Sequence, residues 1–303
     1  MRVAAFYRFL DLQEPAAFRD ELQTLCDEQG LLGTILVAKE GVNGTIAGDS
    51  GSIEAVFAWI EKRLVLDTTI TPHWTDTSTA PFRRMRVRLK DEIVTLGRPD
   101  ILPHENTGTH VSPQEWNELI DDPNVLLIDT RNHYEVELGT FPRAMDPDTD
   151  SFRHFPEFAK DLAESAKGRP LAMFCTGGIR CEKATALMLE LGFDEVYHLQ
   201  GGILNYLTQM SAKENRWDGE CFVFDSRVAV DRDLAEGGYV QCHACRRPLS
   251  SEELASADYR EGISCPHCIG TLEDDRIARL EERRRQVALA RERGDKHIGA
   301  KLD

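Results

Sequence analysis

The sequence predicts a multidomain chain of mixed α/β and α+β architecture, with two larger domains followed by a small cysteine-rich unit. Strands and helices alternate in two different rhythms, one before and one after a stretch rich in Pro, Gly, His and Asn at residues 97–110. Four of the eight cysteines occur as two Cys-x-x-Cys pairs after residue 240. A chain of 303 residues accommodates two or three domains of ordinary size.

Residues 1–100 alternate between apolar runs typical of strands and segments with apolar residues at helical spacing. The expected strands are Val3–Phe9, Leu31–Lys39, a segment that follows the turn-rich residues 40–44 and ends at Ala47, Arg86–Leu89 and Glu92–Thr95. The expected helices are Pro15–Gln29 and Ser52–Leu64. The resulting order β-α-β-β-α-β predicts a ferredoxin-like α+β sandwich.

Residues 111–212 predict a second domain built on a parallel sheet. Ser112, followed by Pro113 and Glu115, is a typical helix start. The short apolar runs Val125–Asp129, Leu171–Cys175 and Glu195–Leu199 are typical of buried strands that alternate with helices. We therefore expect a parallel sheet with helices on both faces.

Residues 213–303 predict a third unit around two Cys-x-x-Cys pairs. Cys242 and Cys245 are separated by 19 residues from Cys265 and Cys268, a spacing typical of structural zinc ribbons. Reduced, metal-free thiols are the alternative. His243 and His267 lie inside the turns and are interpreted as neighbours of the site. A charged helix is expected at Asp274–Arg293, as a docked surface helix or as an RNA-contacting tail.

Composition narrows the class of protein. The formal net charge of −16 argues against a protein that coats nucleic acid indiscriminately. The N-terminus lacks the sustained apolar region of a signal peptide, and no run approaches about 18 apolar residues. Eight cysteines are too few for a disulfide scaffold in a chain of this length, so we expect reactive or metal-bound thiols in the cytoplasm.

The strongest chemical signal is the loop Cys175-Thr-Gly-Gly-Ile-Arg180, which joins a buried strand to a helix. Backbone N–H groups that curl around the thiol, together with the helix N-terminus, would favour the nucleophilic thiolate. Arg180 is expected to contact an incoming anion. Only four residues separate Cys175 from Arg180, too few for the phosphate cradle of cysteine phosphatases, whose loops resemble this one but have five.

Residues 125–206 resemble a rhodanese domain, on the evidence of Asp129-Thr-Arg131, Glu135-Val-Glu-Leu-Gly-Thr-Phe141, Cys-x-x-Gly-x-Arg at 175–180 and Leu199-Gln-Gly-Gly-Ile203. The resemblance implies that Cys175 is the catalytic residue and carries a persulfide. It also implies supporting roles for Asp129 and Arg131, and an active-site loop formed by Thr176, Gly177, Gly178, Ile179, Arg180 and Cys181. The sequence departs from the family pattern at Thr140, often His, and at Arg143, often Gly.

A wider resemblance covers essentially the whole chain. The segments 39–48, 81–90, 92–97, 129–135, 175–183 and 293–299 are similar to the rhodanese-domain tRNA uridine-34 hydroxylases. This resemblance implies conversion of the wobble uridine to 5-hydroxyuridine, with molecular oxygen as co-substrate and the anticodon region of tRNA as partner. It also implies that residues 1–100 bind tRNA. No nucleotide cofactor motif is present.

A dense basic run offers independent support for RNA binding. Its members are Arg83, Arg84, Arg86, Arg88 and Lys90. On a strand, the even-numbered members would project from one face while Met85, Val87 and Leu89 face the core. Such a row contacts phosphates in some proteins and is only a solvated strand face in others.

Three functions remain open, of which the first is the one that the full-length resemblance implies. The first is wobble-uridine hydroxylation, and the second is a sulfurtransferase that passes the persulfide sulfur to a thiol or a tRNA base. The third is an RNA-binding or adaptor protein with a vestigial rhodanese fold, which the intact loop at Cys175 disfavours. Cys181 either resolves a persulfide as a disulfide or packs in the loop wall.

Overall fold

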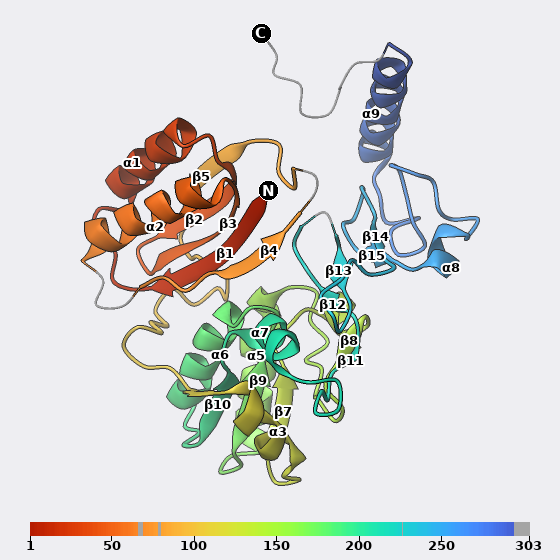
Figure 1. Cartoon of the computed structure of the whole chain (residues 1–303). Coiled ribbons are helices and arrows are strands. Elements are labelled where there is room, and N and C mark those ends of the chain that lie inside the picture. The colour runs from red at the N-terminus through yellow and green to blue at the C-terminus, as the bar shows by residue number, and fades with distance from the viewer. Residues whose placement is uncertain (66–68, 78–79, 226, 294–303) are drawn as a thin grey trace. The chain divides into compact units, whose positions relative to one another are not determined.

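The computed structural model describes the chain except for residues 66–68, 78–79, 226 and 294–303 (Figure 1). It comprises two compact units. The first contains Met1–Cys221 with Arg232–Leu234, and the second contains the remaining described residues. The segment 294–303, which holds most of the last motif of the full-length resemblance, lies outside the described residues. No helix of the described part is long and apolar enough to span a bilayer.

The N-terminal part of the first unit is built on a five-stranded sheet of order β4-β1-β3-β2-β5. Its strands are β1 (Arg2–Phe9), β2 (Leu32–Ala38), β3 (Gly41–Gly48), β4 (His73–Asp76) and β5 (Met85–Leu89). β3 lies between β1 and β2 and is antiparallel to both, while β4 is antiparallel to β1. This arrangement is the ferredoxin-like core that the sequence predicted, with β5 added as a parallel edge strand beside β2.

Two helices, α1 (Pro15–Glu28) and α2 (Ser50–Leu64), cover one face of this sheet (Figure 1). Their apolar stripes include Phe18 and Leu22 on α1 and Val56 and Ile60 on α2, all fully buried. These side chains pack on Phe6 and the other inward-facing residues of the strands. Because successive strand residues alternate between faces, Tyr7 lies on the face opposite the helices.

Three details of the N-terminal part differ from expectation. Residues 92–95 do not form a strand. The Glu92 carboxylate accepts hydrogen bonds from the backbone N–H groups of Leu96 and Gly97, at 3.2 and 2.9 Å. These N–H groups are thus satisfied by a side chain and not by a neighbouring strand. Leu89 is 46% exposed rather than part of the core, because β5 is an edge strand and ends there. The short strand β4 was not anticipated.

The second part of the first unit holds a four-stranded parallel sheet of order β6-β10-β9-β7. These strands are β6 (Thr109–Val111), β10 (Val196–Leu199), β9 (Leu171–Phe174) and β7 (Leu126–Asp129). The three buried runs expected from the sequence form β7, β9 and β10. β6 is an additional strand at the end of the expected linker.

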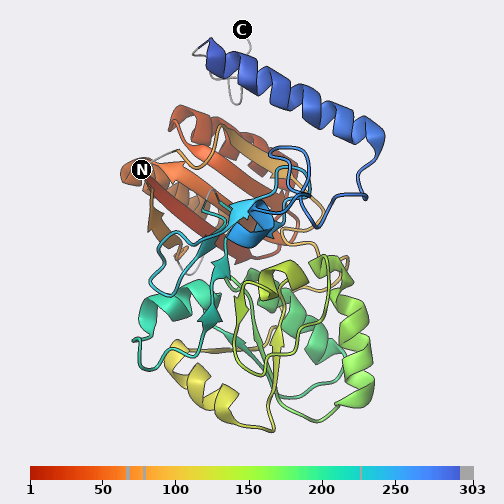
Figure 2. The ribbon, with the colours of Figure 1, turned by 90° about the vertical axis from the view of Figure 1, so that its right-hand side faces the viewer.

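Helices cover both faces of the parallel sheet, as predicted. α5 (Phe155–Ser165) and α6 (Ile179–Glu190) pack together on one face, and α3 (Pro113–Asp121) and α7 (Gly202–Gln209) pack on the other (Figure 2). The Ser112 capping box begins α3, with reciprocal side-chain bonds between Ser112 and Glu115. Shorter elements are α4 (His133–Val136), a 3₁₀ turn at Phe152–His154, and β8 (Gly139–Thr140) paired with β11 (Asp218–Gly219).

The second unit is small and contains little regular structure besides a long helix. β14 (Val240–Gln241) pairs with β15 (Pro248–Leu249), and these are followed by α8 (Ser251–Leu254) and α9 (Asp274–Glu292). β12 (Cys221–Phe222) and β13 (Ala229–Val230) form a further two-stranded sheet. Four cysteines, with Ala244 and Leu249, form the core of this unit.

Candidate active site

Cys175 follows the end of β9 and is enclosed by the loop that leads into α6. The backbone N–H of Gly178 donates to the Cys175 sulfur over 3.1 Å, and the N–H groups of Arg180 and Cys181 also hydrogen-bond to it. Gly178 is the N-cap of α6 with φ of 96°, a conformation that disfavours any residue with a Cβ. The loop therefore directs several backbone donors and a helix N-terminus at one buried sulfur.

The motif Leu199-Gln-Gly-Gly-Ile203 holds this loop from the other side. The N–H of Ile203 donates to the Cys175 carbonyl over 2.9 Å, and the N–H of Leu204 donates to the Thr176 carbonyl over 3.1 Å. A Cβ at Gly202 would lie 2.5 Å from the Cys175 carbonyl oxygen, which no side chain tolerates. The glycine permits the close approach by which the start of α7 fixes the loop.

The environment of Cys175 favours its thiolate. Burial raises the pKa of the thiol, but the hydrogen bond from the Cys181 thiol, the positive charge of Arg180 and the backbone donors outweigh it and lower the pKa to about 6. Burial and the neighbouring Cys175 charge raise the pKa of Cys181 well above its ordinary value. At neutral pH the pair is thus a thiolate beside a protonated thiol. Both cysteines are free.

Arg180 is occupied by a buried carboxylate rather than directed at an open anion site. Its two terminal nitrogens donate to the two oxygens of Glu135 over 2.6 and 2.9 Å. Burial alone would raise the pKa of Glu135, but Arg180 and then Arg131 hold it below the ordinary value. The expected contact between Arg180 and an incoming anion would compete with this bidentate pair. Glu135 was not identified as a site residue from the sequence, because 45 positions separate it from Arg180.

Asp129 and Arg131 form a second buried ion pair behind the loop. Arg131 donates from Nε and Nη2 to the two Asp129 oxygens over 2.9 and 2.6 Å, and from Nη1 to the Glu135 carbonyl over 3.1 Å. Thr140 donates to Asp129 over 2.9 Å, and the Arg131 guanidinium stacks on Trp217. The two residues therefore support the segment that carries Glu135 and do not touch the Cys175 sulfur.

The departure from the rhodanese pattern at Arg143 has a local explanation. Arg143 has φ of 67°, in the left-handed region where glycine is favoured. Its guanidinium donates to the carbonyls of Ile120 and Asp122 at the end of α3, over 3.1 and 3.3 Å. These bonds offset the backbone cost by satisfying carbonyls at the helix C-terminus.

The N-terminal domain reaches the active-site helix at two points that the sequence did not reveal. The Tyr7 hydroxyl donates to Glu182 over 3.1 Å, and a Cβ at Gly178 would lie 2.9 Å from that hydroxyl. Lys183, fully buried, donates to Glu40 over 2.8 Å and also to Glu92. The domain expected to bind tRNA is thus joined to α6 by buried polar contacts next to the Cys175 loop.

The basic run lies on and around the edge strand β5. Arg83, Arg84, Arg86, Arg88 and Lys90 are all exposed, whereas Met85 and Val87 face the core. Within the described part of the chain, Arg83, Arg84, Arg88 and Lys90 form no ion pair with an acidic side chain. The structure therefore leaves a row of cations open to solvent.

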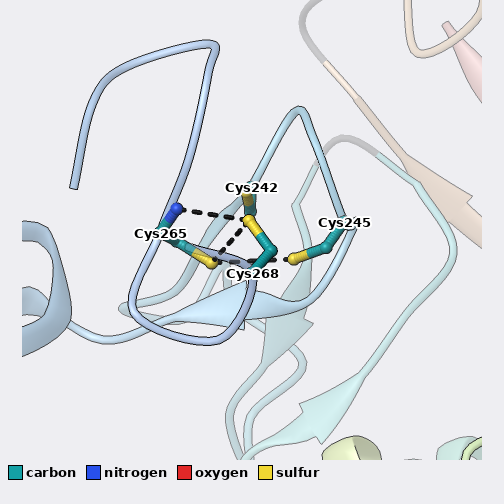
Figure 3. A group of neighbouring side chains, drawn as sticks. All are labelled: Cys242, Cys245, Cys265 and Cys268. Atoms are coloured by element: carbon teal, nitrogen blue, oxygen red, sulfur yellow. Dashed lines mark hydrogen bonds between the residues drawn. The ribbon is translucent and has the colours of Figure 1, made fainter. Parts of the chain in front are cut away.

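The four cysteines of the second unit converge as the spacing predicted (Figure 3). The Cys265 sulfur lies 3.6 Å from the sulfurs of both Cys245 and Cys268, and all four sulfurs lie within 4.8 Å of one another. Four thiolates around a tetrahedral Zn²⁺ would be about 3.8 Å apart at ordinary Zn–S lengths. The donor set fits a structural zinc ion. His243 and His267 do not belong to the group.

Two family models match the chain. Residues 1–93 match the UPF0176 acylphosphatase-like domain, and residues 112–209 match the rhodanese-like domain. The pair of domains fits the UPF0176 family. The rhodanese-like domain, with Cys175 in its loop, supports a catalytic function of the sulfurtransferase or broader rhodanese type.

Three solved structures to which the chain is similar cover 29–37% of it. A rhodanese-like domain from Anabaena is 16% identical, covers 37% of this chain and 80% of its own, and has a TM-score of 0.31. A single-domain sulfurtransferase from Saccharomyces cerevisiae is 20% identical, with coverages of 34% and 92% and a TM-score of 0.29. An acylphosphatase from Coxiella burnetii is 18% identical, with coverages of 29% and 90% and a TM-score of 0.22.

Proposed function

We propose that this protein hydroxylates the wobble uridine of tRNA to 5-hydroxyuridine in an oxygen-dependent reaction at Cys175. The observation that carries the proposal is the buried Cys175 sulfur, to which the N–H of Gly178 donates over 3.1 Å and beside which the Cys181 thiol lies at the start of α6. The pair supplies a nucleophilic sulfur and an adjacent proton donor within one loop. The sequence similarity to rhodanese-domain tRNA uridine-34 hydroxylases supports uridine-34 as the nucleotide on which this pair acts.

Binding of tRNA is proposed for the N-terminal domain. The exposed cations of β5 supply a row of phosphate contacts in a protein whose net charge is otherwise strongly negative. A row on one strand, in the same compact unit as Cys175, gives a local attraction that bulk repulsion does not cancel. Because tRNA is the proposed substrate, we propose that the protein acts in the cytoplasm.

Zinc is proposed as a structural ion held by Cys242, Cys245, Cys265 and Cys268. When bound, it would supply folding free energy to the second unit and no chemistry, because four thiolates leave no open coordination position. The described core cluster of this unit consists of the cysteines and a few apolar neighbours, so a bound ion would lie at its centre.

Sulfur transfer is the rival function, and the same loop supports it. A persulfide on Cys175 would lie among the N–H groups of Gly178, Arg180 and Cys181. An acceptor thiolate would attack the terminal sulfur and form a new persulfide as the S–S bond to Cys175 breaks, and Cys175 would leave as the thiolate. That acceptor would carry the sulfur onward to a tRNA base.

Mass spectrometry of tRNA nucleosides distinguishes the two reactions. A host strain without its own 5-hydroxyuridine synthesis would express the wild-type chain, the Cys175→Ser variant or the Cys26→Ser variant, a matched control at a buried cysteine outside the site. We expect 5-hydroxyuridine with the wild type and the control, in air only, and none with Cys175→Ser. Product formed by the serine variant would remove Cys175 from the mechanism, and 2-thiouridine as the only new nucleoside would establish the sulfurtransferase.

A further inference from the structure

Three potential metal ligands meet behind the active-site helix. His110 on β6 and His198 on β10 are neighbours in register on paired strands, with ring centroids 4.1 Å apart. Glu182, on the first turn of α6, reaches both, and its Oε1 lies 3.0 Å from Nε2 of His110. One ligand atom from each of the three residues lies within 4.8 Å of the others.

A hydrogen bond fixes the protonation of His198. Its Nε2 lies 3.1 Å from the carbonyl oxygen of Gly108, which can only accept, so Nε2 carries the proton. In the neutral ring with its proton on Nε2, Nδ1 keeps its lone pair. That Nδ1 atom is buried, in a residue that is only 1% exposed, and it has no hydrogen-bond partner among the described residues. A buried, unsatisfied acceptor of this kind is unfavourable unless something occupies it.

The arrangement has the features of a metal ligand set with its supporting hydrogen bonds. Metal-binding histidines ordinarily donate their second N–H to a backbone carbonyl or a carboxylate, as His198 does to Gly108. Thr107 likewise donates to Oε2 of Glu182 over 3.1 Å, while Oε1 accepts from the Tyr7 hydroxyl and lies against Nε2 of His110. Two ligands bound at about 2.1 Å lie roughly 3.0–3.4 Å apart, which the His110–Glu182 pair already satisfies.

We propose that His110, Glu182 and His198 bind a divalent first-row transition metal such as Fe²⁺ or Zn²⁺. Two imidazoles and one carboxylate are borderline ligands that suit these ions and leave coordination positions open. His110 is exposed, so an ion reaches the site from solvent, while the other two residues are buried. The His110–Glu182 hydrogen bond breaks when both groups turn to the metal.

The metal site adjoins the Cys175 loop but does not rest on the proposed hydroxylation. Glu182 follows Cys181 directly, and the Tyr7 hydroxyl that donates to Glu182 also lies against Gly178 of the loop. The competing interpretation is a metal-free clasp, in which a protonated His110 pairs with Glu182. That pair raises the pKa of His110.

Metal stoichiometry tests the proposal on the full chain. Protein with its four-cysteine group already loaded with zinc would be titrated calorimetrically with Zn²⁺ and, under anaerobic conditions, with Fe²⁺. The variants are His110→Ala, whose exposed side chain can be removed without leaving a cavity, and Glu182→Gln, with His104→Ala as the control histidine outside the cluster. Thermal unfolding of each variant verifies that it is folded.

We expect wild type and His104→Ala to bind one equivalent beyond the four-cysteine ion with the same affinity. His110→Ala and Glu182→Gln should lose at least 100-fold in affinity for that equivalent. Nitric oxide would then be added to the Fe²⁺-loaded protein. The electron paramagnetic resonance signal of a high-spin nitrosyl complex would demonstrate open coordination positions at the ion. If wild type binds no second equivalent, or if both cluster variants bind it unchanged, the metal site is refuted and the clasp remains.

Discussion

Replacing Cys181 with alanine is expected to raise the pKa of Cys175 from about 6 to a value closer to that of an ordinary thiol. Among the groups that lower this pKa, the Cys181 thiol is first, ahead of the charge of Arg180. A hydrogen bond to a charged group contributes about 1.5–3 kcal/mol, which corresponds to roughly one to two pKa units. The alanine variant should therefore titrate between roughly pH 7 and 8.

The consequence at neutral pH is large. With a pKa near 6 the wild-type sulfur is about 90% thiolate at pH 7, and in the alanine variant this falls to roughly 10–50%. Cys181→Ser is the matched control, because a hydroxyl of similar size still donates to the sulfur. Its midpoint should remain within about half a unit of wild type.

The assay is nuclear magnetic resonance of protein labelled with ¹³C at the cysteine Cβ, titrated from pH 4 to pH 10. The signal of Cys175 is identified by its absence from the Cys175→Ser spectrum. This measurement requires no reagent to reach a sulfur that is fully buried. An alanine variant that titrates at the wild-type midpoint would refute the role of Cys181, and a wild-type midpoint near 9 would refute the structural account of the thiolate.

Four further predictions follow from the same network and from the cysteine group. Lys183→Met leaves two carboxylates buried without their cation, so urea unfolding should show a loss of about 3–5 kcal/mol, and a loss under about 1 kcal/mol would contradict the buried triad. Glu135→Gln removes the negative partner of Arg180, so the Cys175 midpoint should move below about 6 in the same titration; an upward move would show that Glu135 orients Arg180 more than it neutralises it. The pKa of Cys175 is lower in the folded than in the unfolded chain, so its ionisation adds to the free energy of unfolding. This contribution is complete above pH 9, declines by about 1.4 kcal/mol per pH unit down to pH 6 and is absent below pH 6. Unfolding experiments on Cys175→Ala should lack this slope. Chelation of zinc, or Cys242→Ser, should increase hydrogen exchange across residues 240–270 while the Cys175 titration stays unchanged, and unaltered exchange after verified metal loss would contradict a structural ion.

The sequence predicted those features that depend on residues close together in the chain. The Cys175 loop, the Ser112 capping box and the two Cys-x-x-Cys turns each lie within a few residues, and local backbone preferences fix their geometry. Most strands of the two sheets, though not β4 and β6, were also predicted, because the apolar period of a strand or a buried run does not depend on its partners. Where local pattern misled, as at Glu92–Thr95, a side chain supplied the hydrogen bonds that a neighbouring strand would have given.

Only the tertiary structure decided what surrounds the reactive sulfur. Glu135 occupies Arg180, and Tyr7 and Lys183 connect the N-terminal domain to α6, across separations of 45 to 175 residues. No spacing rule relates such residues, because the contacts exist only once separate elements pack. The chain by itself determined that Cys175 would lie in a loop whose own backbone donors, Arg180 and Cys181 favour its thiolate. Tertiary packing determined which distant side chains hold that loop and its helix in place, because Glu135, Tyr7 and Glu40 reach them only in the folded chain.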